Sequence, residues 1–221
     1  MPMANSPARP GPSTSATSMT AIATVLVLVV LSIAFVDRPV AVYAHSVLRV
    51  HEPFFAALTH FVDPIPVAAG LICGGYVVAA LFGHRPGPCG RVALRIAITV
   101  LIAVALKEQI KVLAGRTWPE TWTANNPSYI KDGIYGFFPL QGLWTGGRAY
   151  HSFPSGHMTA ISVAAVSLAL ILPRWCWLAP IPVALVAIGM IGTNYHWVSD
   201  LIAGTALGSA VALASHRLSR D

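Results

Sequence analysis

Charged residues are scarce in this chain. Only 10% of its 221 residues are Asp, Glu, Lys or Arg, whereas 55% are hydrophobic. This balance is too apolar for a soluble domain of the same length, and no separate soluble domain is visible. The sequence therefore predicts one membrane domain over residues 19–216. Residues 1–18 are rich in Pro, Ser, Thr and Ala, and we expect them to form a disordered tail.

Cysteines are few and basic tracts are absent. The three cysteines, Cys73, Cys89 and Cys176, do not have the spacing of metal ligands. Cys89 and Cys176 lie in loops that we assign to the cytoplasm, where thiols stay reduced, so we expect no disulfide and no zinc. No set of His, Asp and Glu has the spacing of metal ligands either, so we expect activity to need no divalent metal. We also expect no cofactor. The net charge of +6 is scattered along the chain. This distribution favours membrane-topology signals and an anionic substrate, and it argues against a nucleic-acid partner.

Long apolar runs predict an all-α integral membrane protein with a bundle of six transmembrane helices. We interpret the first run as a retained anchor, although residues 42–44 also fit a signal-peptidase site. Glycines four residues apart in the second and sixth runs predict close helix packing. The six runs cover 20–36, 64–83, 91–114, 154–172, 175–195 and 197–215, and the glycine pairs are Gly70 with Gly74 and Gly204 with Gly208.

The connection between the third and fourth predicted helices is unusually long and rich in aromatic residues. We interpret this segment, 115–152, as an interfacial loop that forms a lid or a substrate-entry surface. Segment 37–63 is also expected to lie along the interface. Six spans place both ends of the long loop on one membrane face. Lys and Arg are evenly divided between the two membrane faces, but several of those on the face of the motifs could be site residues rather than topology signals. The distribution therefore gives a weak preference for cytoplasmic termini and for an extracytoplasmic site in a plasma or bacterial inner membrane.

A polar motif, Pro154-Ser155-Gly156-His157, opens the fourth apolar run. Free N–H groups at a helix N-terminus can hold an anion, and proline is tolerated in the first turn. A serine hydroxyl, a glycine that admits close approach and a histidine that titrates near neutral pH suit a phosphate group. The alternative is a capped helix whose histidine only faces the interface.

A second motif opens the sixth run, where His196 and Asp200 are four residues apart. This spacing places both side chains on one helix face. A carboxylate one turn away can fix the imidazole tautomer and raise its basicity. Because an ionisable aspartate is costly near a membrane helix, Asp200 is a functional candidate, with helix capping as the alternative role.

Taken in order, these motifs resemble the type 2 phosphatidic acid phosphatase (PAP2) family over about residues 107–208. The resemblance implies that His196 attacks phosphorus to form a phosphohistidine. Asp200 would orient His196, and His157 would protonate the leaving alkoxide. Lys111 matches the family lysine, counted back from Trp118-Pro119. Lys111, Ser155 and the amides of Gly156 and His157 would bind the phosphate oxygens.

Two family arginines are missing from this chain. Trp118 stands where the family carries the arginine of Arg-Pro, and Gly189-Met190 stands where it carries Ser-Arg. An arginine clamp normally contributes strongly to phosphate binding. We expect other cations to replace it, with Arg116 and Arg148 as the main candidates and Lys107 also nearby. Alternatively, Arg148 is solvated and Arg116 pairs with Glu120.

Three functions remain open at this point. The first is a metal-independent membrane phosphatase that hydrolyses a phosphate monoester or a diphosphate of a lipid. The second is a phosphotransferase resembling the inositol phosphorylceramide and sphingomyelin synthases, which share the His, His and Asp set but pass the headgroup to an alcohol. The third is an inactive relative that binds or transports a lipid. All three imply a lipid partner within a membrane.

Overall fold

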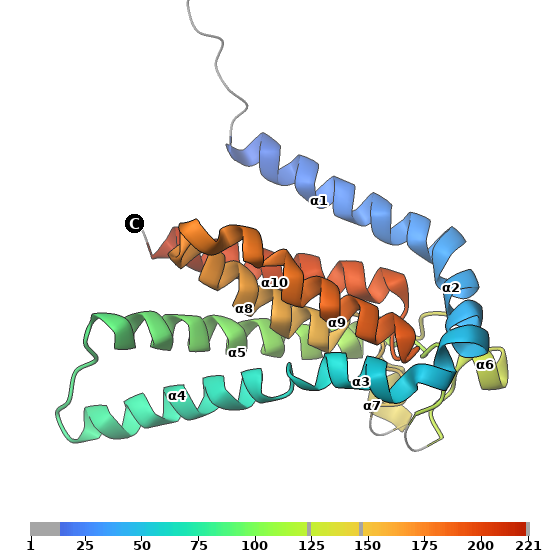
Figure 1. The fold of residues 1–221 in the computed structure, drawn as a ribbon, viewed down its shortest axis with the longest axis horizontal. Helices are drawn as coiled ribbons and strands as arrows, with labels where there is room; N and C mark the ends of the chain where they lie inside the picture. The colour runs from blue at the N-terminus through green and yellow to red at the C-terminus, as the bar shows by residue number, and fades with distance from the viewer. Residues whose placement is uncertain (1–13, 123–124, 146–147, 220–221) are drawn as a thin grey trace, which may run out of the picture.

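The structure, a computed structural model, describes residues 14–122, 125–145 and 148–219, and these contain helices and no strand (Figure 1). The prediction of an all-α protein is therefore confirmed. Isolated β-bridges join parts of the long loop, for example Arg116 with Phe137 and with His151. These bridges fold the loop back on itself at the end of the helix that precedes it.

The helices include two π-helical segments (η1 and η2) and two 3-10 segments (η3 and η4). In chain order they are α1 (Thr14–Leu31), η1 (Ser32–Val36), α2 (Asp37–Tyr43), η2 (Ala44–Leu48), η3 (Arg49–His51), α3 (Glu52–His60), α4 (Pro64–Leu81), α5 (Pro88–Ala114), α6 (Tyr129–Asp132), α7 (Gln141–Thr145), α8 (Gly156–Ile171), η4 (Pro173–Leu178), α9 (Pro180–Gly192) and α10 (Val198–Leu218).

Helix α8 is the centre of the bundle and packs against α5, α9 and α10, while α4 packs against α5 and α3 against α9. Helix α1 lies at an angle to this bundle, contacts α10 and is followed by α2 (Figure 1). Two apolar clusters fill the spaces around α8. One contains Met158, Ile161, Val186, Met190 and Leu201, and the other contains Ala69, Val100, Ala103, Val163 and Ala212.

Four helical stretches in the described part of the chain are long and apolar enough to cross a membrane: 18–81, 88–114, 173–192 and 198–218. Helix α8 is apolar but has only 16 residues, fewer than the roughly 20 that a span usually needs. Many large apolar side chains on these helices are exposed, as a lipid-facing surface requires. The chain is therefore an integral membrane protein, and the count of six spans stays a prediction.

Residues 14–18 differ from their prediction, whereas the interfacial placement of segment 37–63 stays a prediction. Residues 14–18, predicted to belong to a disordered tail, form the start of α1, and residues 1–13 lie outside the described residues. Segment 37–63 is almost entirely helical, and its first residue, Asp37, is only 1% exposed. The apolar pattern gave no sign of this burial, because a carboxylate becomes buried only when a distant partner neutralises it.

The two predicted glycine packing faces have different outcomes. A Cβ atom at Gly204 would lie 2.5 Å from the Ser155 carbonyl oxygen, and one at Gly208 would lie 2.4 Å from that of Thr159. Close packing of α10 on α8 is thus confirmed. Around Gly70 and Gly74 nothing lies within 4 Å of such an atom. The prediction of close packing there is wrong, because α4 presents these glycines to open space.

We therefore predict opposite effects for the same substitution at two glycines. Gly208→Ala should destabilise the bundle by about 1–3 kcal/mol, because the added methyl group forces α8 and α10 apart. Gly70→Ala, the matched control, should leave stability unchanged or raise it by about 0.5–1 kcal/mol, because alanine favours a helix and meets no neighbour. Thermal unfolding of detergent-purified protein measures both. Equal stability of Gly208→Ala and the parent would contradict the close packing.

Candidate active site

A cavity of about 360 Å³ lies among the C-terminal turns of α5, the first turn of α8 and the junction of α9 with α10. Three basic residues, three histidines and two acidic residues share its wall with apolar side chains. Its lining comprises Val62, Asp63, Pro66, Val104, Lys107, Glu108, Lys111, Trp118, Arg148, His151, Gly156, His157, Ala160 and His196. The two motif histidines, far apart in sequence, therefore face one cavity.

The ring of His196 is positioned by the contacts of its Nδ1 atom. Its Nδ1 atom lies 3.3 Å from Asp200 Oδ2 and 3.5 Å from Ser152 Oγ. With Asp200 as acceptor, Nδ1 carries the ring proton of a neutral imidazole. The Nε2 atom then has a free lone pair, as a nucleophile requires.

The environment of His196 keeps the ring uncharged. Burial, with a smaller contribution from the nearby Lys111, outweighs the opposing effect of Asp200 and lowers the pKa of His196 to about 4. The neutral form therefore dominates at neutral pH. A neutral imidazole is the reactive form for attack on phosphorus.

Asp200 is fully buried and accepts several hydrogen bonds. Its Oδ2 atom accepts from Ser152 Oγ at 2.5 Å and from the Trp197 N–H at 3.2 Å, so the carboxylate also caps α10. Both roles that the sequence left open, capping and partnering His196, are present together. The cap fixes the carboxylate relative to the helix, and this position sets the ring of His196.

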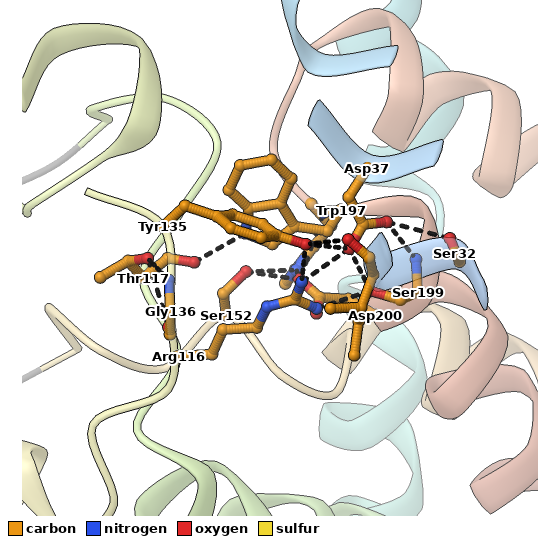
Figure 2. Close-up of polar contacts among 12 residues, drawn as sticks. Ser32, Asp37, Arg116, Thr117, Tyr135, Gly136, Ser152, Trp197, Ser199 and Asp200 are labelled. Carbon is orange, nitrogen blue, oxygen red and sulfur yellow. Dashed lines mark hydrogen bonds and ion pairs between the residues drawn. The ribbon is translucent and has the colours of Figure 1, made fainter. Parts of the chain in front are cut away.

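Arg116 lies outside the cavity lining. Its guanidinium is fully buried between two carboxylates: Nη1 lies 2.5 Å from Asp200 Oδ1, and Nη2 lies 2.6 Å from Asp37 Oδ2 (Figure 2). The predicted phosphate contact of Arg116 is corrected accordingly, since both terminal nitrogens are occupied. The alternative pairing with Glu120 is not formed either, because Glu120 pairs with Arg49 and His45.

The charge of Arg116 is secured by its surroundings. Burial opposes the charged form, but the carboxylates of Asp200 and Asp37 outweigh it and raise the pKa of Arg116 above its ordinary value. The Tyr135 hydroxyl oxygen lies 2.7 Å from the Ile33 carbonyl oxygen and 3.2 Å from Asp37 Oδ2, so its one O–H proton is shared between these two acceptors. Burial and the nearby Asp37 raise the pKa of Tyr135 to about 12, so this phenol stays a donor.

Three cations line the cavity. Lys111 is 7% exposed and donates to the His151 carbonyl oxygen, Lys107 lies 2.6 Å from Glu108, and Arg148 is exposed at the rim. The structure thus brings Lys107, Lys111 and Arg148 together with both motif histidines. This group supplies the positive charge that an anionic phosphate needs.

The two small motif residues at the start of α8, Ser155 and Gly156, have different positions relative to the cavity. Ser155 is fully buried as the N-cap of α8, where its hydroxyl accepts from the Met158 N–H at 3.4 Å. Its side chain is therefore outside the cavity lining. Gly156 lines the cavity, and a Cβ atom there would lie 3.3 Å from Lys107 Nζ. Glycine at this position leaves the lysine and the helix terminus open to an anion.

His157 has a carboxylate partner that the motif did not indicate. Its Nε2 atom lies 3.2 Å from Asp63 Oδ1 at the turn before α4. This contact comes from a residue 94 positions away, so local spacing carries no signal for it. The same holds for Ser152 and Asp37, whose contacts with the motif depend on tertiary folding.

The two residues that replace family arginines have apolar roles. Trp118 lines the cavity, with its ring centroid 5.1 Å from that of His196 and 5.6 Å from Lys111 Nζ. Met190 is 0% exposed and belongs to the apolar cluster around α8. Neither position can therefore contribute charge, and the cations of the cavity come from α5 and the long loop.

Fold and site together define an all-helical membrane protein with a cationic pocket and a histidine held by a carboxylate. The profile of the PAP2 superfamily matches residues 92–221. This match covers more than half of the chain, and the chain belongs to that superfamily.

Known relatives of the chain are lipid phosphatases. Undecaprenyl-diphosphatase of Sulfolobus acidocaldarius is 31% identical over 57% of this chain and 54% of its own length. Lipid A 1-phosphatase of Rhizobium johnstonii is 31% identical over 52% of this chain and 43% of its own. The chain therefore spans about half the length of these relatives. A solved PAP2-type phosphatidylglycerolphosphate phosphatase of Bacillus subtilis is 18% identical, with a TM-score of 0.48 over 90% of this chain and 95% of its own.

The low pKa of His196 predicts a specific pH dependence of stability. In the unfolded chain this histidine takes up a proton near pH 6.5, whereas the folded protein does so only near pH 4. Stability linked to His196 is therefore present above pH 6.5 and falls as the pH drops from 6.5 towards 4.

His196→Gln should remove this part of the pH dependence. We expect the thermal midpoint of the parent to fall more between pH 7 and pH 5 than that of His196→Gln. His84→Gln, a substitution in the turn before α5, is the control for loss of an exposed histidine. Identical pH slopes for the parent and His196→Gln would contradict a neutral buried His196.

Proposed function

We propose that this protein is a membrane lipid phosphatase that hydrolyses a phosphate monoester or a diphosphate of a lipid through a phosphohistidine. The observation that carries the proposal is the shared cavity in which His196, held by Asp200, faces His157 and three cations. The named phosphatase relatives and the superfamily match support the reaction class.

In the first step, the Nε2 lone pair of His196 forms a bond to phosphorus as the bond to the leaving oxygen breaks. His157 gives its proton to that oxygen, so the lipid leaves as an alcohol, or as a phosphate if the substrate is a diphosphate. The ring of His196 becomes positively charged, and the Asp200 carboxylate beside Nδ1 stabilises this charge.

In the second step, water attacks the phosphohistidine. Neutral His157 accepts a proton from the water, the N–P bond breaks, and inorganic phosphate leaves with His196 neutral again. Asp63 contacts His157 in the structure, and this carboxylate stabilises the protonated ring before the first step and again after the second. The cycle requires both histidines in one cavity and no redox change.

The equatorial phosphate oxygens need donors. Lys107, Lys111 and Arg148 line the cavity, and the first-turn amides of α8 open onto it beside Gly156. An ammonium binds phosphate as a point charge, whereas a guanidinium forms paired hydrogen bonds. We therefore expect this pocket to bind phosphate more weakly than a pocket with two arginines would. We also propose that it opens on the extracytoplasmic face, in accord with the basic-residue distribution.

A second candidate function is transfer of the phosphoryl headgroup to an alcohol. The observation in its favour is the apolar character of Trp118 and Met190, the positions of the missing arginines. Both reactions share the phosphohistidine and differ only in whether water or an alcohol attacks it. The released products therefore separate them.

We predict different defects for the two histidines. With a panel of lipid phosphates and diphosphates, His196→Ala should abolish turnover and covalent labelling by ³²P-substrate. His157→Ala should slow turnover by roughly 10²–10⁴-fold. This second defect should shrink for a nitrophenyl phosphate, because nitrophenolate leaves without a proton.

Free phosphate, transferred product and bound label are measured together. Normal labelling in His196→Ala would place the nucleophile elsewhere. A transferred lipid product without free phosphate would favour the transferase. A folded parent that binds these lipids without turning any over would indicate a binding protein.

For the cations, we predict that Arg148→Ala weakens substrate binding. Loss of one charged contact to a phosphate costs about 1.5–3 kcal/mol, so KM should rise by about tenfold or more. Arg85→Ala is the matched control, because Arg85 is exposed in the turn at the other end of α5. An unaltered KM for phosphate substrates in Arg148→Ala would show that Arg148 is only a solvated loop residue.

A further inference from the structure

Asp37, the first residue of α2, lies at the centre of a buried polar cluster. It is 1% exposed, and its Oδ1 atom accepts from Ser32 Oγ at 3.0 Å and from the Ser199 N–H at 2.9 Å. Its Oδ2 atom accepts from Ser199 Oγ at 2.5 Å and from Arg116 Nη2 at 2.6 Å. Figure 2 shows these contacts converging between the N-terminal helix and the start of α10.

Arg116 connects Asp37 to the catalytic carboxylate. The guanidinium reaches Asp37 with Nη2 and Asp200 with Nη1, and Asp200 in turn reaches His196 Nδ1. Asp37, Arg116 and Asp200 have side chains that are 0% exposed. In such a poorly polarisable environment their charges act on one another without much screening.

The charge balance of this chain of contacts matters for the proposed reaction. Arg116 alone would neutralise Asp200, and a neutralised carboxylate stabilises a positive imidazole poorly. Asp37 supplies a second negative charge, so the group of Asp37, Arg116 and Asp200 carries one net negative charge. That net charge faces His196, which becomes positive when it binds phosphorus.

We propose that Asp37 is a positioning residue for the phosphoryl-transfer step: through Arg116 it offsets the guanidinium charge and holds Asp200 in an anionic state directed at His196. Asp37 does not line the cavity, so we expect it not to touch the substrate. Its effect should therefore appear in kcat and in the rate of phosphoenzyme formation rather than in KM. This inference rests on the proposed phosphohistidine function.

Asp37→Asn removes the charge while keeping the shape of the side chain. We expect kcat and the rate of ³²P labelling to fall by about tenfold or more, equivalent to at least one pKa unit of lost interaction, with little change in KM. Asp132→Asn is the matched control, because it removes an exposed acidic charge on α6 that does not contact Arg116. If Asp37→Asn is not recovered folded, Asp37→Ser takes its place, because serine is smaller and cannot clash.

The decisive variant is the double substitution Asp37→Asn with Arg116→Met. Removing both charges restores one net negative charge on Asp200, so kcat should recover several-fold relative to Asp37→Asn. A purely structural role predicts the reverse, because a second substitution in the same buried cluster should add to the damage. Melting temperatures in detergent are measured for every variant, so that activity is compared only between folded proteins.

The outcomes are distinct. A parental kcat in folded Asp37→Asn overturns the inference, and so does a folded double variant that is no faster than Asp37→Asn. In both cases the loss of labelling in His196→Ala leaves the proposed function standing. If the parent forms no phosphoenzyme and His196→Ala keeps its turnover, the proposed function fails and this inference falls with it.

Discussion

The charge of Arg116 is the constraint on which the active end of the molecule depends. A guanidinium that is fully buried must be neutralised and must fill its hydrogen bonds, or the fold loses several kcal/mol. Arg116 meets the charge requirement with carboxylates from two separate helices, α2 and α10, which its two terminal nitrogens contact. Its backbone also pairs with Ser152, which approaches α8. The side chain and backbone of this one residue thereby connect the N-terminal helices, the long loop and the last helix.

The sequence predicted the parts of the site that depend on local spacing. His196 and Asp200 are four residues apart on one helical turn, and the structure places their side chains 3.3 Å apart. His157 opens an apolar helix as expected and lines the same cavity as His196. These placements followed from helix geometry and from the family resemblance. The membrane character followed from the scarcity of charge in the long apolar runs.

Long-range pairing could not be predicted in the same way. Asp37 and Arg116 are 79 residues apart, and nothing in the residues around either one indicates the other. Arg116 was expected in the phosphate pocket because it lies two residues before Trp118, in the segment that leaves the third predicted helix beside Lys111. Position along a chain, however, does not show which way a side chain points. Gly70 and Gly74 illustrate the converse error, since their spacing matched a packing motif without a helix to pack against.

The cavity shows how positive charge is provided without the two missing arginines. Lys107 and Lys111 lie one turn apart on α5, and Arg148 approaches from the far end of the loop. Trp118 closes the wall beside His196. An aromatic wall excludes water from one side of the histidine, and this strengthens the remaining electrostatic interactions.

Burial of Asp37 also bears on where this protein can be divided. The superfamily profile begins at residue 92, downstream of α1, α2, α3 and α4. A boundary drawn there passes between Arg116 and one of its two carboxylates. The first helices are therefore not an interchangeable membrane anchor. If the leading segment of another superfamily member replaced them and had no acidic residue at the position of Asp37, Arg116 would lose one of its two carboxylate partners.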